Sequence, residues 1–108
     1  MTRRLILDPD AARDLDAIFR HIAPHNLPAA ERYVRELRDR CAFYADSPFI
    51  GLSEPSVARR LGFPADQVRS FLYRNHRAYY VVSDEEVRVF GFIDTRRDLD
   101  TALDERLH

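Results

Sequence analysis

Hydrophobic residues recur at helical spacing in the first part of the chain. Between residues 9 and 22 the apolar positions lie three or four residues apart, and they are Leu15, Ile18, Phe19 and Ile22. Asp8 and Pro9 precede this segment, and an aspartate followed by a proline is a typical helix start. The pattern predicts a short strand over residues 5–7 and then a helix that ends before Pro24.

A second segment of helical periodicity extends from about residue 28 to about residue 45. Its apolar side consists of Ala30, Tyr33, Val34, Leu37, Cys41 and Tyr44. Glutamate and arginine stand four residues apart on its outer side, as in Glu31 and Arg35, and this spacing stabilises helices. The connection between the two helices is short, so we expect them to pack as an antiparallel hairpin.

The hydrophobic period changes to two in the last part of the chain. Residues 47–67 are rich in proline and glycine and are expected to form a loop, with one short turn of helix near residues 55–61. The three strands predicted after this loop cover residues 68–73, 77–83 and 87–93. Their connections are short enough for hairpins. A short helix is expected after the last strand, with Arg97 and Asp98 at its start.

These elements describe a single α+β domain over residues 1–108. An N-terminal strand and a helical hairpin pack on one face of a small antiparallel sheet, in the order β-α-α-β-β-β, and a short C-terminal helix follows. The opposite face of the sheet is expected to remain open to water or to a partner.

Composition narrows the class of protein. The 108 residues carry a net charge of -1, and all 17 basic residues are arginine. Arginine can pair with a phosphate or a carboxylate through two parallel hydrogen bonds. Cys41 is the single cysteine, which excludes an internal disulfide. No stretch approaches 18 consecutive apolar residues, so we expect a cytoplasmic protein with no membrane partner.

The sequence contains no complete motif for a metal or a cofactor. His21 and His25 have the spacing of a helical zinc pair, but Pro24 between them breaks the helix and no third ligand is evident. Cys41 lies on the apolar side of its helix and is interpreted as a core residue. Neither a glycine-rich phosphate loop nor a nucleophile elbow is present. We therefore expect no metal and no cofactor.

Arginines and aromatic residues are interleaved on the predicted strands. The arginines are Arg69, Arg74, Arg77 and Arg88, with Arg96 and Arg97 after the last strand. A basic and aromatic sheet can bind single-stranded nucleic acid, although arginines at edges and turns can also be simply solvated. Arg69 shares a face of its strand with Phe71 and Tyr73, and Arg77 shares a face of the next strand with Tyr79. The sequence does not fix which of these faces meet.

The order of elements and six short motifs resemble the RelE/ParE superfamily of bacterial type II toxin–antitoxin systems, and most closely the ParE branch, also called plasmid stabilisation proteins. The motifs are Ala12-x-Asp14-Leu15-x-x-Ile18, Asn26-x-x-Ala29-Ala30-x-Arg32, Ser47-Pro48-x-x-Gly51, Val68-Arg69-Ser70-Phe71, Tyr80 and Arg96-Arg97-Asp98. The resemblance covers about residues 5–98. It implies a small antiparallel sheet cradled by a helical hairpin.

The resemblance implies two alternative activities. Studied ParE-like toxins poison DNA gyrase, whereas RelE-like toxins cleave messenger RNA on the ribosome with basic residues and, in many members, a tyrosine near the C-terminus. Both kinds are neutralised by a cognate antitoxin encoded beside the toxin. A protein partner is therefore implied in either case.

Individual residues place the chain between the two branches. Arg69 and Arg77 match basic positions of RelE-like toxins, and Arg96 matches an arginine of both branches. Asp94 stands where ParE-like chains usually carry histidine, and its charge lowers the positive field that a phosphate would need. No tyrosine follows Asp98, and His108 is the one group beyond the carboxylates that can exchange a proton there.

RNA cleavage requires both a base and an acid. Arginine does not exchange protons near neutral pH. His76 is the remaining candidate acid or base, although a solvated turn histidine is the simpler interpretation.

We therefore expect a ParE-like toxin that binds its target, DNA gyrase, without catalytic residues of its own. The candidate target-binding residues are Arg69, Arg77, Arg96 and Arg97. One alternative is a RelE-like ribosome-dependent messenger-RNA endonuclease. Another is a chain that has lost toxicity and still binds the antitoxin. The antitoxin is expected across the helical hairpin or along an exposed sheet edge.

Overall fold

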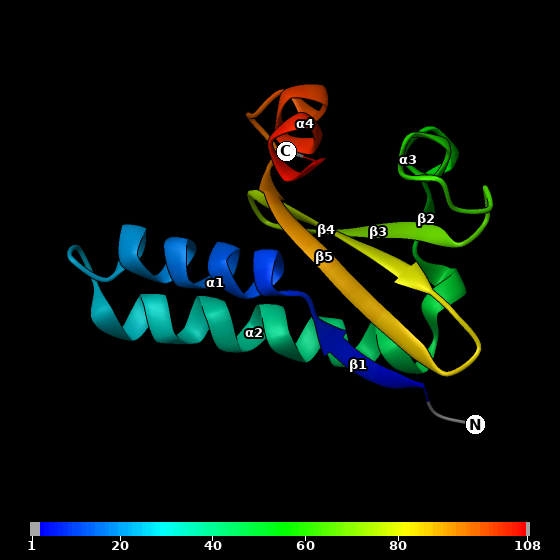
Figure 1. Ribbon diagram of the computed structural model, residues 1–108. Coiled ribbons are helices and arrows are strands. Elements are labelled where there is room, and N and C mark those ends of the chain that lie inside the picture. Colours follow the sequence, from blue (N-terminus) through cyan, green and yellow to red (C-terminus); the bar gives the residue numbers. More distant parts are fainter. Residues whose placement is uncertain (1–2, 108) are drawn as a thin grey trace.

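The computed structural model describes residues 3–107, which form a sheet with helices on both of its sides (Figure 1). The elements are β1 (Arg4–Leu7), α1 (Pro9–Ile22), α2 (Leu27–Asp46), η1 (Pro48–Ile50), β2 (Leu52–Ser53), α3 (Pro55–Leu61), β3 (Val68–Tyr73), β4 (His76–Val82), β5 (Glu86–Asp94) and α4 (Leu99–Leu107). The α+β class, the helical hairpin and the three-stranded meander are confirmed. In the described part of the chain, no helix is long and apolar enough to cross a membrane.

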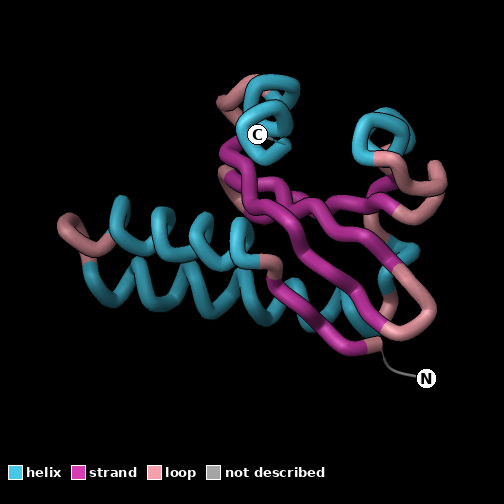
Figure 2. Tube along the Cα trace, in the orientation of Figure 1, coloured by secondary structure: helices cyan, strands magenta, loops and turns pink. Residues whose placement is uncertain are grey.

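The sheet has five strands in the order β1-β5-β4-β3-β2 and is mixed (Figure 2). The predicted antiparallel meander is extended at both edges, by a parallel strand on one side and an antiparallel strand on the other. β1 lies parallel to β5, with Leu5 opposite Val87, and β2 adds a two-residue edge strand beside β3. Two backbone hydrogen bonds hold the ends of β1 against this neighbour, from the N–H of Arg4 to the carbonyl of Glu85 and from the N–H of Asp8 to the carbonyl of Val89.

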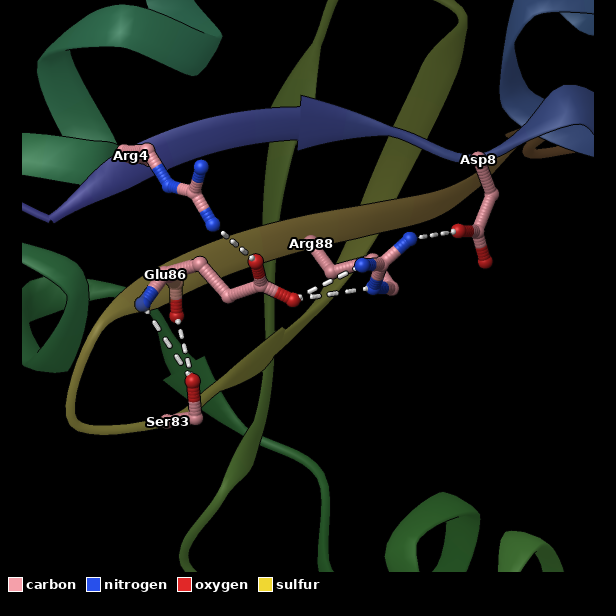
Figure 3. Close-up of polar contacts among 5 residues, drawn as sticks. All are labelled: Arg4, Asp8, Ser83, Glu86 and Arg88. Carbon is pink, nitrogen blue, oxygen red and sulfur yellow. Dashed lines mark hydrogen bonds and ion pairs between the residues drawn. The ribbon is translucent and has the colours of Figure 1, made fainter.

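A chain of ion pairs joins β1 to β5 (Figure 3). Arg4 contacts Glu86 at 3.5 Å, Glu86 accepts from Arg88 at 2.8 Å, and Arg88 donates to Asp8 at 2.8 Å. Asp8 occupies the N-cap position of α1, yet its side chain makes no capping bond. It pairs with Arg88 instead, so this carboxylate fixes the start of the helix against the sheet.

The sheet buries apolar side chains on both faces. The face toward α1 and α2 carries the larger core, which includes Phe71, Tyr73, Ala78, Tyr80, Val82, Val87, Val89 and Phe92. The other face carries Val68, Tyr79 and Ile93, and these are covered by Val57 and Ala58 of α3 and by Ala102 and Leu103 of α4. The expectation of an open second face is thus wrong. The two short helices are apolar on one side, and they bury that side on the alternate residues of the strands.

Asp14 of α1 connects the two layers. Its Oδ2 accepts a hydrogen bond from the backbone N–H of Phe92 at 2.9 Å and from Nη2 of Arg106 in α4 at 2.6 Å. The guanidinium of Arg106 lies over Gly91, where an added Cβ would be 3.3 Å from the guanidinium carbon. Glycine therefore leaves room for this close approach, because a side chain here would force the guanidinium of Arg106 to shift. Gly91 follows the β-bulge in the pairing of β4 with β5.

Replacing Asp14 by alanine should destabilise the protein by about 3 kcal/mol, because the partly buried guanidinium of Arg106 and the N–H of Phe92 lose their shared acceptor. Urea unfolding followed by circular dichroism measures this change. The matched control is Asp16→Ala on the same helix, whose partner Arg20 is 77% exposed, and it should cost less than about 1 kcal/mol. Equal losses in the two variants would contradict the assigned role of Asp14.

Candidate functional site

The loop after β5 folds back on the last residue of that strand. The Asp94 carboxylate accepts the backbone N–H of Arg96 at 2.9 Å, its Nε at 2.9 Å and its Nη2 at 2.6 Å. These hydrogen bonds hold the pKa of Asp94 well below its usual range. The side chain of Arg96 nevertheless stays 78% exposed, so its guanidinium is oriented by Asp94 while it faces water.

Arg97 and Asp98 build the start of α4, as the sequence indicated. Arg97 donates to Glu105 at 2.8 Å. The Asp98 carboxylate accepts from the backbone N–H of Asp100 at 3.3 Å and from the hydroxyl of Thr101 at 2.9 Å. Both residues therefore have a structural role. Arg97 is also partly exposed at the surface.

The strand register separates two of the four candidate arginines. Arg69 stands opposite Tyr80 and Arg77 stands opposite Leu72, so their side chains lie on opposite faces of the sheet. Arg77 lines a cavity of about 290 Å³ together with Asp94 and Arg97. We call the group Arg77, Asp94, Arg96 and Arg97 the Asp94 corner. A single patch of all four arginines is not formed.

Arg69 instead supports the loop that precedes β2. Its guanidinium donates to the carbonyls of Asp66, Phe49 and Gly51 at 3.1, 3.2 and 3.1 Å. It also lies 5.1 Å from the centre of the Phe49 ring, within cation–π distance. All three carbonyls belong to the chain itself, so much of its hydrogen-bonding capacity is used internally.

A cavity of about 480 Å³ lies between the helical hairpin and the end of the sheet, on one side of the Asp94 corner. Its lining includes His21, Tyr33, His76, Asp94 and Arg96. Tyr33 was interpreted from the sequence as a core residue, but its hydroxyl lies 2.8 Å from Nδ1 of His76. The helical period located this residue on the correct side of α2. It gave no sign of the polar contact, which depends on the first residue of β4, distant in sequence.

Burial, more than any nearby charge, lowers the pKa of His76, while Asp94 opposes the shift. Burial also raises the pKa of Tyr33. The imidazole is therefore neutral near pH 7 and can accept a proton at a cavity that Arg96 also lines. Among the described residues, no three histidine, cysteine or carboxylate side chains are grouped to hold a metal ion. His108 lies outside the described residues.

The family model of the ParE toxin of the type II toxin–antitoxin system, parDE, matches residues 5–99. A solved structure, the chromosomal ParDE toxin–antitoxin system from P. aeruginosa, is similar in fold with a TM-score of 0.67. It is 24% identical in sequence, and the match covers 86% of this chain and 96% of that chain. A search of curated proteins found no match.

The lowered pKa of His76 predicts a stability that falls on acidification. An unfolded histidine binds a proton near pH 6.5, whereas folded His76 binds it only at lower pH, so protons favour the unfolded state across this window. Unfolding midpoints measured between pH 7.5 and pH 5 should decrease less steeply in His76→Asn than in the native protein. His25→Asn, which alters an exposed histidine, should leave the slope unchanged. Parallel slopes in all three proteins would contradict the prediction.

Proposed function

The chain belongs to the ParE toxin family of type II toxin–antitoxin systems, and from this premise we propose that it arrests bacterial growth by binding DNA gyrase in the cytoplasm and that a cognate antitoxin neutralises it. The family match over residues 5–99 is the observation that carries this proposal. It spans the hairpin, the sheet from Leu5 onward and the Asp94 corner. Inhibition by binding needs a presented surface and no nucleophile or metal.

We assign target contact to the Asp94 corner. Arg96 uses its Nε and Nη2 on Asp94, which leaves Nη1 without an acceptor among the described residues. A guanidinium held in this way loses little conformational entropy when it pairs with a carboxylate on a partner. Arg77 and Arg97 lie on the adjoining cavity, so the corner suits an acidic protein surface.

We assign antitoxin binding to the sheet edge at β2. Four large apolar side chains within residues 43–52 are about half exposed or more, namely Phe43, Phe49, Ile50 and Leu52. β2 is the outermost strand on this side, so its outer backbone groups can pair with an added strand. Arg69 stiffens the loop beneath it through the carbonyls of Phe49 and Gly51. This assignment moves Arg69 from the target-binding group to the support of the antitoxin surface.

A second candidate function is cleavage of messenger RNA on the ribosome. The observation that favours it is the shared cavity of His76 and Arg96, since a neutral imidazole and a cation are two of the groups that such a reaction uses. The carboxylate of Asp94 is hydrogen-bonded to Arg96 and reduces the attraction of that site for phosphate. The binding function is therefore the better supported of the two.

Two purified reactions separate these functions. We expect the protein to inhibit supercoiling by gyrase and to trap cleaved DNA, while a cell-free translation reaction programmed with messenger RNA continues. Arg96→Gln should raise the concentration needed for inhibition by about tenfold or more, because a charge-assisted hydrogen bond contributes about 1.5–3 kcal/mol.

Arg20→Gln is the matched control, since Arg20 also forms an exposed pair with a carboxylate, and it should inhibit as the native protein does. Arrested translation with normal supercoiling would establish the ribonuclease alternative. Normal activity in both reactions would leave a chain that has lost toxicity and still binds its antitoxin.

Leu52→Glu should weaken capture of the product of the adjacent antitoxin gene by about tenfold or more, because the variant places a charge in an apolar contact that excludes water. Co-expression, affinity capture of the complex and titration by calorimetry measure this change. Leu27→Glu at the start of α2, where the side chain is also half exposed, should bind normally. The reverse result would place the antitoxin on the helical hairpin instead.

A further inference from the structure

The turn between β3 and β4 contains a strained arginine. Arg74 has φ +50°, and it is the one non-glycine residue with a positive φ in the described part of the chain. A side chain in this backbone region costs free energy that glycine avoids. Residues 74 and 75 form a two-residue hairpin connection, a place where glycine is often found. The arginine therefore occupies this position against the local preference of the backbone.

The side chain of Arg74 is held in place by an aromatic residue. Its Nε donates to the Tyr73 hydroxyl at 3.2 Å, and its guanidinium carbon lies 5.6 Å from the centre of the Tyr73 ring. The Tyr73 hydroxyl in turn donates to Glu36 of α2. Among the described residues, no carboxylate lies within ion-pair distance of Arg74. Tyr73 thus fixes the position of the guanidinium, and among the described residues no carboxylate pairs with its charge.

A second arginine shares the same cavity. Arg32 of α2 and Arg74 line a space of about 140 Å³, whose apolar lining includes Ile22 and Ala29. Arg32 is exposed and also forms no ion pair with a described residue. Two guanidinium groups beside a small apolar surface match an acidic side chain, which carries methylene groups below a carboxylate.

We propose that this cavity binds a glutamate or aspartate side chain of a partner protein. Its lining includes Ile22 and Tyr33, which also line the larger cavity at the Asp94 corner. The turn is fastened to the loop after β5 by a hydrogen bond from the N–H of Thr95 to the carbonyl of Asn75 at 2.8 Å. A protein seated on the corner therefore has this second point of contact within reach.

A protein side chain fits the cavity better than a nucleic acid does. Glu36 also lines this space, and its carboxylate accepts the Tyr73 hydroxyl. It repels a polyphosphate, which carries several charges, more strongly than it repels a single carboxylate. Tyr73 is only 6% exposed, so its ring offers no platform on which a base can stack. The net charge of -1 also gives the chain little general attraction for nucleic acid.

Nuclear magnetic resonance of the arginine Nε–H groups tests this proposal without any measurement of toxicity. The probe is an acetylated, amidated hexaglutamate peptide, titrated into the purified protein at constant ionic strength. We expect saturable shifts of the Arg32 and Arg74 signals, with weaker effects from hexathymidylate and from inorganic phosphate. Tighter binding of hexathymidylate than of hexaglutamate, or shifts without saturation, would overturn the proposal.

The variant Arg74→Gly removes the arginine side chain and also relieves the backbone strain, so the loss of binding can be told apart from a loss of stability. We expect this variant to bind hexaglutamate at least fivefold more weakly and to unfold thermally at the same temperature as the native protein or above it. Arg32→Gln should also weaken binding, and Arg59→Gln, which alters an exposed arginine of α3, should not. Unchanged affinity in Arg74→Gly, or an effect of Arg59→Gln equal to that of Arg32→Gln, would overturn the proposal.

Discussion

The carboxylate of Asp14 is the group on which the arrangement of the two layers depends. It receives the N–H of Phe92 from β5 and the guanidinium of Arg106 from α4, so one side chain of the hairpin fixes both the sheet and the helix on its far side. The contact lies two residues before Asp94, where β5 ends. The position of Asp94, and with it that of Arg96, is therefore set by a hydrogen bond made inside the protein.

Arginine performs most of the long-range connections in this chain, which contains no lysine. Arg88 joins β5 to the start of α1 through Asp8, Arg69 holds the loop before β2, and Arg106 joins α4 to α1. The planar guanidinium can serve two or three acceptors at once. Arg32 and Arg74 do not have such carboxylate or carbonyl partners among the described residues.

The sequence predicted the helices and strands well. It predicted poorly which strands pair and which distant side chains meet, for physical reasons. Helix ends were marked by Pro9 and Pro24, and the period of two marked residues 68–73, because both signals arise from neighbouring residues. The parallel pairing of β1 with β5 and the burial of Tyr79 under α3 and α4 depend on residues far apart in the chain. The separation of Arg69 from Arg77 likewise required the register. The contact of Tyr33 with His76 was hidden because an aromatic residue on an apolar helix face is normally a core residue.

In the Asp94 corner, carboxylates neutralise part of the positive charge of the arginines. This neutralisation bears on whether the corner binds a protein or cleaves RNA. Asp94 and Glu105 hold Arg96 and Arg97, so the corner has little net field to attract a phosphate. The same carboxylates fix where the outer edges of the two guanidinium groups lie. Fixed donors with a weak net field favour short-range recognition of carboxylates over long-range capture of a polyanion. By this argument, the geometry of the corner favours the proposed protein contact over the alternative of RNA cleavage.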